Sequence, residues 1–129
     1  MAMSLAHQAN FRILAWTVVV VAMLSASRSI EGHAILKESS PAASSSVAGP
    51  DVPIMLKFNV RVDATRSRVQ LLRPDNATTN LVIAKQTSPD TLTTMATGLR
   101  PGAYKIEWQA LASDGHITRG LVPFNVTGS

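Results

Sequence analysis

The sequence predicts an all-β domain, a sandwich or a barrel, preceded by a short targeting segment. From His33 onward no apolar periodicity of the helical kind lasts longer than a turn or two, and Pro, Gly, Ser, Asn or Asp interrupts the chain every several residues. Between these interruptions apolar and polar residues alternate, as in strands with one buried face. Seven strands are expected. Two packed antiparallel sheets are the economical way to bury their apolar faces.

The first 32 residues have the pattern of a secretory signal peptide. Their apolar run, Ile13 to Leu24, is shorter than the roughly 20 residues of a membrane span and fits the roughly 7–15 of a signal core. An uncleaved membrane anchor is the alternative. Small residues permit cleavage after Ala26 or after Gly32, and the pattern does not choose between the two sites. Cleavage after Gly32 leaves a mature domain of 97 residues, 33–129.

The N-terminal half of the domain contributes three expected strands, 34–38, 52–62 and 68–72. The first is a short run that leads into a loop of small residues, 39–46. The second has the clearest alternation, because every even-numbered position from Ile54 to Val62 is apolar and the positions between are mostly polar. The third follows a turn and directs Val69 and Leu71 inward.

The C-terminal half contributes four more expected strands, 81–84, 91–95, 103–111 and 117–126. The first of these is a short apolar run, and the second is rich in threonine, a residue of high β-propensity. The third follows the turn at Pro101-Gly102 and places Tyr104 and Trp108 on one face, where both are expected to be core aromatics. The fourth ends with Val122, Phe124 and Val126 on one face.

Composition excludes several classes of function. The chain has no cysteine, which excludes disulfides, thiolate metal sites, cysteine nucleophiles and a lipid-modified cysteine anchor. The domain 33–129 carries ten Lys and Arg against seven Asp and Glu, a net charge of +3 that is spread along the chain. A nucleic-acid surface would need a denser basic patch with aromatic residues to stack on bases. We therefore expect no nucleic-acid partner. Because the apolar run Ile13 to Leu24 lies within the predicted signal peptide, we also expect a mature protein that does not span a membrane.

Three residues are candidate metal ligands: His33, Asp114 and His116. In an extended backbone residues two apart point to the same side, so Asp114 and His116 can reach one ion. If cleavage leaves His33 first, its α-amine and imidazole can close a chelate ring on that ion. A nitrogen-rich set without sulfur suits Cu(II), one ion per chain. The alternatives are an ordinary Asp-Gly turn and an ordinary residue at a frayed terminus.

Several short motifs, in this order along 33–126, resemble the CopC family of periplasmic copper-binding proteins. They are His33-Ala34-x-Leu36, Ser40-Pro41-Ala42, Leu56-x-Phe58, Leu99-x-x-Gly102-x-Tyr104-x-Ile106-x-Trp108 and Ser113-x-Gly115-His116. The resemblance implies an immunoglobulin-like, seven-stranded Greek-key β-sandwich. It also implies a Cu(II) site built from the mature N-terminal histidine and an Asp-x-His pair, which match His33, Asp114 and His116, with no further cofactor.

The resemblance further implies an exported, periplasmic copper carrier or buffer without catalysis, whose partner is a CopD-type inner-membrane copper transporter. The sequence departs from members with a methionine-rich Cu(I) site, because only Met55 and Met95 follow His33. Since Cu(I) selects thioether ligands, we expect binding of Cu(II) alone. Two other functions remain open: a copper-dependent oxidative enzyme with a histidine brace, and a structural sandwich module without metal.

Overall fold

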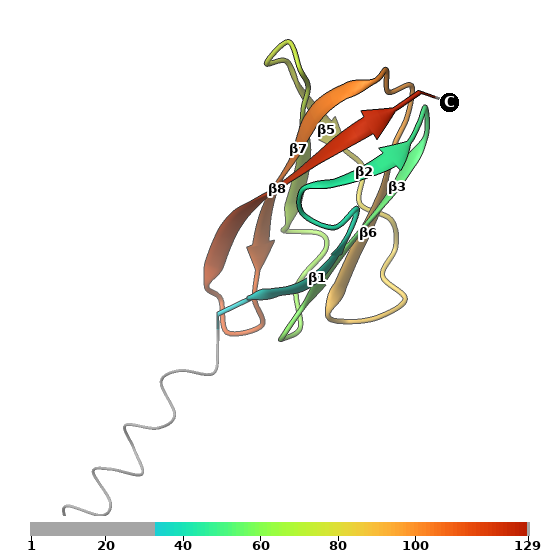
Figure 1. The fold of residues 1–129 in the computed structure, drawn as a ribbon. Coiled ribbons are helices and arrows are strands. Elements are labelled where there is room, and N and C mark those ends of the chain that lie inside the picture. The colour runs from blue at the N-terminus through green and yellow to red at the C-terminus, as the bar shows by residue number, and fades with distance from the viewer. Residues whose placement is uncertain (1–32, 129) are drawn as a thin grey trace, which may run out of the picture. The chain divides into compact units, whose positions relative to one another are not determined.

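The computed structural model describes residues 33–128, whose regular structure is entirely β (Figure 1). Eight strands form two sheets: β1 (Leu36–Ser40), β2 (Ser45–Ala48), β3 (Val52–Phe58), β4 (Arg68–Leu72), β5 (Thr78–Leu81), β6 (Thr91–Ala96), β7 (Gly102–Leu111) and β8 (Ile117–Thr127). The smaller sheet has the order β1-β3-β6 and the larger the order β2-β8-β7-β4-β5. All pairs are antiparallel except β2 with β8.

This topology confirms the expected immunoglobulin-like sandwich. In immunoglobulin lettering the smaller sheet holds strands A, B and E, and the larger holds G, F, C and C′, with β2 added beside β8. The Tyr104 hydroxyl donates a hydrogen bond of 2.8 Å to the carbonyl of Arg100, just before β7. A tyrosine bonded in this way at the start of strand F is the tyrosine corner of the immunoglobulin fold.

The core lies between the sheets and is filled mainly by alternate residues of β3, β4, β6, β7 and β8. The buried set includes Val52, Ile54, Leu56 and Phe58 from β3, Tyr104, Ile106, Trp108 and Ala110 from β7, and Val122, Phe124 and Val126 from β8. Phe58 and Trp108 meet edge to face across the two sheets, with ring centroids 5.1 Å apart. The prediction that Tyr104 and Trp108 are core aromatics is confirmed.

The strand count and three strand boundaries differ from expectation. The eighth strand is β2, in a segment predicted to be a loop, and its small side chains are only partly buried, so it gave no apolar signal. The β3 ladder ends at Phe58 rather than at 62, although Val62 is buried and bridges Ala112. β5 covers 78–81 in place of 81–84, and β1 runs from 36 to 40 in place of 34 to 38. The alternation of apolar residues reports which side chains are buried, and burial can continue beyond the last paired residue of a strand, as it does at Val62.

The part of the chain covered here, 33–128, has no helix of a length and apolarity that would let it cross a lipid bilayer. The predicted signal peptide and its cleavage sites lie outside the described residues.

Candidate metal centre

The turn that joins β7 to β8 carries two of the three candidate ligands. Its ends are closed by a hydrogen bond of 2.9 Å from the Ala112 amide to the His116 carbonyl, and the Gly115 amide donates to the Ala112 carbonyl at 2.9 Å. Gly115 has a φ of +89°, in the region that glycine reaches without strain. A three-residue hairpin loop with glycine in this conformation is a common way to connect two strands. The expectation of extended backbone at Asp114–His116 was therefore wrong.

The turn nevertheless brings Asp114 and His116 together. Oδ1 of Asp114 accepts the His116 backbone N–H at 3.0 Å, and Oδ2 lies 2.6 Å from Nδ1 of the His116 imidazole. The imidazole hydrogen bond, followed by the backbone one, lowers the pKa of the Asp114 carboxyl below its usual range. An ionised carboxylate can only accept, so Nδ1 of His116 donates the shared proton, and in the neutral imidazole Nε2 is the nitrogen with a free lone pair. Both carboxylate oxygens of Asp114 are thus hydrogen-bonded to His116, and these bonds fix the carboxylate beside the imidazole.

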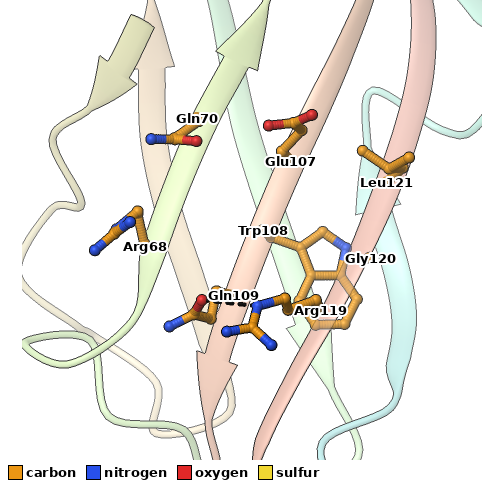
Figure 2. A pocket seen from close by; sticks show the side chains of 8 residues that line it. All are labelled: Arg68, Gln70, Glu107, Trp108, Gln109, Arg119, Gly120 and Leu121. Carbon is orange, nitrogen blue, oxygen red and sulfur yellow. Dashed lines mark hydrogen bonds between the residues drawn. The ribbon is translucent and has the colours of Figure 1, made fainter. Parts of the chain in front are cut away.

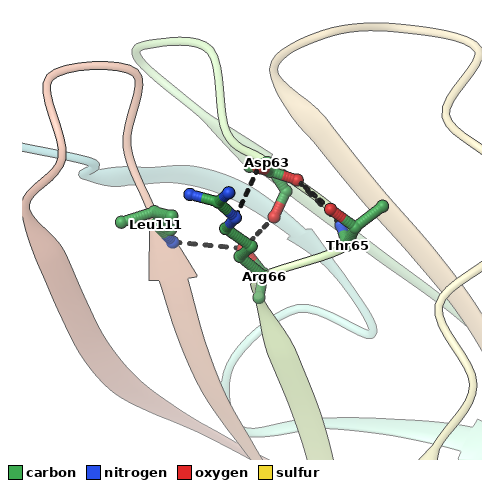
Figure 3. Close-up of polar contacts among 5 residues, drawn as sticks. Asp63, Thr65, Arg66 and Leu111 are labelled. Carbon is green, nitrogen blue, oxygen red and sulfur yellow. Dashed lines mark hydrogen bonds and ion pairs between the residues drawn. The ribbon is translucent and has the colours of Figure 1, made fainter.

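The loop between β3 and β4 is hydrogen-bonded to the base of this hairpin (Figure 3). The Asp63 amide donates to the Leu111 carbonyl at 2.9 Å, and the Ser67 hydroxyl accepts the Leu111 amide at 3.1 Å. The Ser113 amide donates to the Arg61 carbonyl at 3.1 Å. Because the end of β7 and the turn are both hydrogen-bonded to this loop, the turn projects from a fixed frame.

The N-terminal segment reaches the same end of the sandwich, and Figure 1 shows the start of β1 beside the β7–β8 turn. Ala34 is 3% exposed, and its carbonyl accepts the Thr118 hydroxyl at 2.9 Å across 84 positions of sequence. Ile35 exchanges two hydrogen bonds with Asn59. These contacts place the His33 imidazole 4.7 Å from that of His116, measured between ring centroids.

All three predicted residues therefore lie at one end of the fold, joined pairwise: Asp114 to His116, and His116 to His33. Within 33–128 no three His, Asp or Glu side chains are grouped closely enough to hold a metal ion by themselves. The sequence joins the α-nitrogen of His33 to Gly32 by a peptide bond. Asn59 and Thr118, which hold the N-terminal segment, were missed because a polar residue just after or within a strand is common and carries no distinctive sequence signal.

A surface hollow of about 410 Å³ lies elsewhere, on the larger sheet over β4, β7 and β8 (Figure 2). Arg68 and Gln70 line it from β4, and Arg119 from β8 bonds to Gln109 of β7 at 2.9 Å. None of the candidate ligands lines this hollow. The aromatic residues of 33–128, namely Phe58, Tyr104, Trp108 and Phe124, are all buried. The part of the chain that the structure describes thus presents no aromatic platform beside the histidines.

Comparison with known proteins gives consistent matches over this domain. The family model of the CopC domain matches residues 36–127. Copper resistance protein C of Xanthomonas campestris pv. juglandis is 29% identical over 124 residues, which are 90% of this chain and 97% of that protein. Protein YobA of Escherichia coli (strain K12) is 28% identical over 118 residues, 89% of this chain and 95% of the relative.

A solved structure agrees with these sequence matches. The crystal structure of CopC from Methylosinus trichosporium OB3b superposes with a TM-score of 0.70 at 30% identity, over 74% of this chain and 95% of that one. The match of the family model to residues 36–127, which are most of the chain, shows that the chain belongs to the CopC family.

Proposed function

We propose that this protein is an exported copper-binding protein of copper homeostasis or resistance, and that it carries or buffers one Cu(II) ion. The observation that carries the proposal is the meeting of His33, Asp114 and His116 at one end of the sandwich. The names of the relatives support the metal, since one of them is a copper resistance protein.

The proposed ligands are the α-amine and imidazole of His33, the imidazole of His116 and the carboxylate of Asp114. This set has three nitrogens, one oxygen and no sulfur, and tetragonal N/O sets suit Cu(II) rather than Mg²⁺ or Ca²⁺. The carboxyl of Asp114, whose pKa is lowered by its hydrogen bonds to His116, is ionised at neutral pH as an ordinary aspartate is, so it can act as an oxygen ligand. The amine and imidazoles must lose protons to bind, so the affinity for Cu(II) should fall as pH is lowered.

The proposal includes processing before His33, because only then is the α-amine free. Residues 1–32 would be the signal peptide that directs the domain to the periplasm, and 33–129 the mature protein. A CopD-type membrane transporter is the proposed partner for copper delivery, by analogy within the family. Catalysis is not part of the proposal, since the aromatic side chains of 33–128 are buried and offer no surface for a polysaccharide.

The test begins with N-terminal sequencing of the exported protein, followed by Cu(II) titration and electron paramagnetic resonance. We expect a start at His33, one tightly bound ion, and loss of the copper signal in His116→Ala. Asp114→Asn should weaken binding, whereas Asp63→Asn should not. Asp63 is a matched control because its carboxylate also accepts the backbone amide two residues on, at 2.9 Å. A mature start near Ser27 with spectra unchanged in His116→Ala would overturn the proposal.

A further inference from the structure

We infer that Thr118 and Asn59 are positioning residues that hold the N-terminal arm, residues 33–35, in place so that His33 can share a metal ion with His116. The inference rests on the proposed function for its consequence and on the hydrogen bonds of the arm for its geometry. Neither residue contacts the metal in this scheme. Each acts through the backbone next to His33.

Thr118 ties the arm to the larger sheet. Its hydroxyl donates to the Ala34 carbonyl at 2.9 Å. Ala34 directly follows His33, and Thr118 lies two positions after His116, so this bond joins the two segments that carry the histidines. One edge of β8 is paired with β7 and the other with β2. The pairing with β2 covers only residues 124–127 of β8, so no strand is paired with that edge at Thr118. A side chain therefore makes the contact that a paired strand would otherwise make.

Asn59 ties the arm to the smaller sheet. The paired register of β1 and β3 ends at Leu36 and Phe58. The Asn59 amide donates to the Ile35 carbonyl at 3.0 Å, and the Ile35 amide donates to Oδ1 of the Asn59 side chain at 2.6 Å. The side chain thus takes the place of a backbone acceptor and extends the ladder by one residue. Only a short side chain with an oxygen acceptor, such as Asn or Asp, can place that acceptor close enough to its own backbone to replace a carbonyl in the ladder.

Together the two residues fasten a terminus that would ordinarily fray. The arm is bonded to both sheets, and Ala34, which carries the attachment to Thr118, is buried with 3% exposure. If either attachment is lost, the arm spends part of its time away from His116, and the apparent dissociation constant rises by the inverse of the competent fraction. Loss of one hydrogen bond of ordinary strength corresponds to an increase of about 2- to 12-fold.

The experiment uses the mature chain that begins at His33. Thr118→Val keeps the side-chain shape and removes the hydroxyl, Thr118→Ser restores it, and Asn59→Leu removes the acceptor. The control is Thr127→Val, at the other end of β8, where the Thr127 hydroxyl donates to the Val47 carbonyl at 3.2 Å. We measure the dissociation constant for Cu(II), the paramagnetic resonance spectrum, and hydrogen exchange of the Ile35 amide in the metal-free protein.

We expect Thr118→Val and Asn59→Leu to weaken Cu(II) binding by about 2- to 12-fold each and to speed exchange at Ile35. Thr118→Ser should bind as the parent protein does, and Thr127→Val should change neither readout. Parent-like affinity and exchange in both Thr118→Val and Asn59→Leu would overturn the inference while leaving the proposed function intact. If the parent protein binds no Cu(II), the proposed function falls, and Ile35 exchange then decides alone whether the two residues hold the arm.

Discussion

Replacement of Gly115 by alanine should test how the turn prepares the candidate site. Gly115 has a φ of +89°, and nothing lies within 4 Å of the position that a Cβ would take. The cost of alanine is therefore conformational rather than steric, about 1–2 kcal/mol for an L-residue held at positive φ. At about 4–8 °C per kcal/mol for a domain of this size, the melting temperature should fall by roughly 4–16 °C if the turn keeps its shape.

If the turn instead relaxes to a different shape, the same free energy appears as lost affinity for Cu(II). Binding would then have to restore the conformation that brings Asp114 to His116, and the dissociation constant would rise by up to about 5- to 30-fold. We expect the loss of stability and the loss of binding free energy in Gly115→Ala to sum to about 1–2 kcal/mol. Gly115→Asn should cost less on both measures, because asparagine tolerates positive φ.

Gly98→Ala is the matched control, since Gly98 also has a positive φ, +66°, and open space where a Cβ would lie. It lies between β6 and β7, outside the candidate site. Thermal unfolding of the metal-free protein and Cu(II) titration are measured on both variants. Gly98→Ala should lose stability alone. The reasoning fails if Gly115→Ala changes neither quantity, or if Gly98→Ala weakens copper binding as much as Gly115→Ala does.

Three further predictions concern stability. Gly120→Ala should cost about 1–3 kcal/mol in urea unfolding by overpacking, because its Cβ would clash with the Trp108 ring. A Trp108→Phe background should reduce this penalty. Tyr104→Phe should lower the free energy of unfolding by about 0.5–1.5 kcal/mol, because the hydrogen bond from its hydroxyl to Arg100 is lost. A variant as stable as the parent protein would contradict this prediction. The Thr65 hydroxyl bond lowers the pKa of Asp63, so the folded state binds fewer protons there. The stability that Asp63 contributes is complete above the pKa of the unfolded chain, near 3.9, and is lost as pH falls through the lower folded pKa. The melting temperature of Asp63→Asn should therefore depend less steeply on pH in this acid range than that of the parent protein. An unchanged pH dependence would contradict the role given to the Asp63 carboxylate.

The fold could be predicted from sequence where burial and strand pairing coincide. β7 has both, because Tyr104 and Trp108 are buried on one face and every residue of the strand is paired with β8. β2 could not be found, because Ser45–Ala48 has small side chains and is paired with a strand far along the chain. In the segment 81–84 the apolar run was misleading, since Val82 is 87% exposed and lies outside any strand.

The candidate site could be predicted only in part, and for a similar reason. The pairing of Asp114 with His116 is local, and their spacing indicated it even though a turn rather than an extended strand produces the contact. The approach of His33 depends on Thr118 and Asn59, which hold the arm from the two sheets. No local pattern encodes such a meeting, so the sequence predicted it only through family resemblance.

The central proposal is that Cu(II) binding requires the free α-amine of His33, and one comparison tests it most directly. Two proteins are prepared, one that begins at His33 and one that begins at Ser27, the other predicted start. Both keep His33, Asp114 and His116, and only the first has an amine on His33. We expect the chain that begins at Ser27 to bind Cu(II) more weakly by at least about tenfold, roughly 1.4 kcal/mol, with an altered paramagnetic resonance spectrum. Equal affinities and identical spectra for the two chains would contradict the proposal.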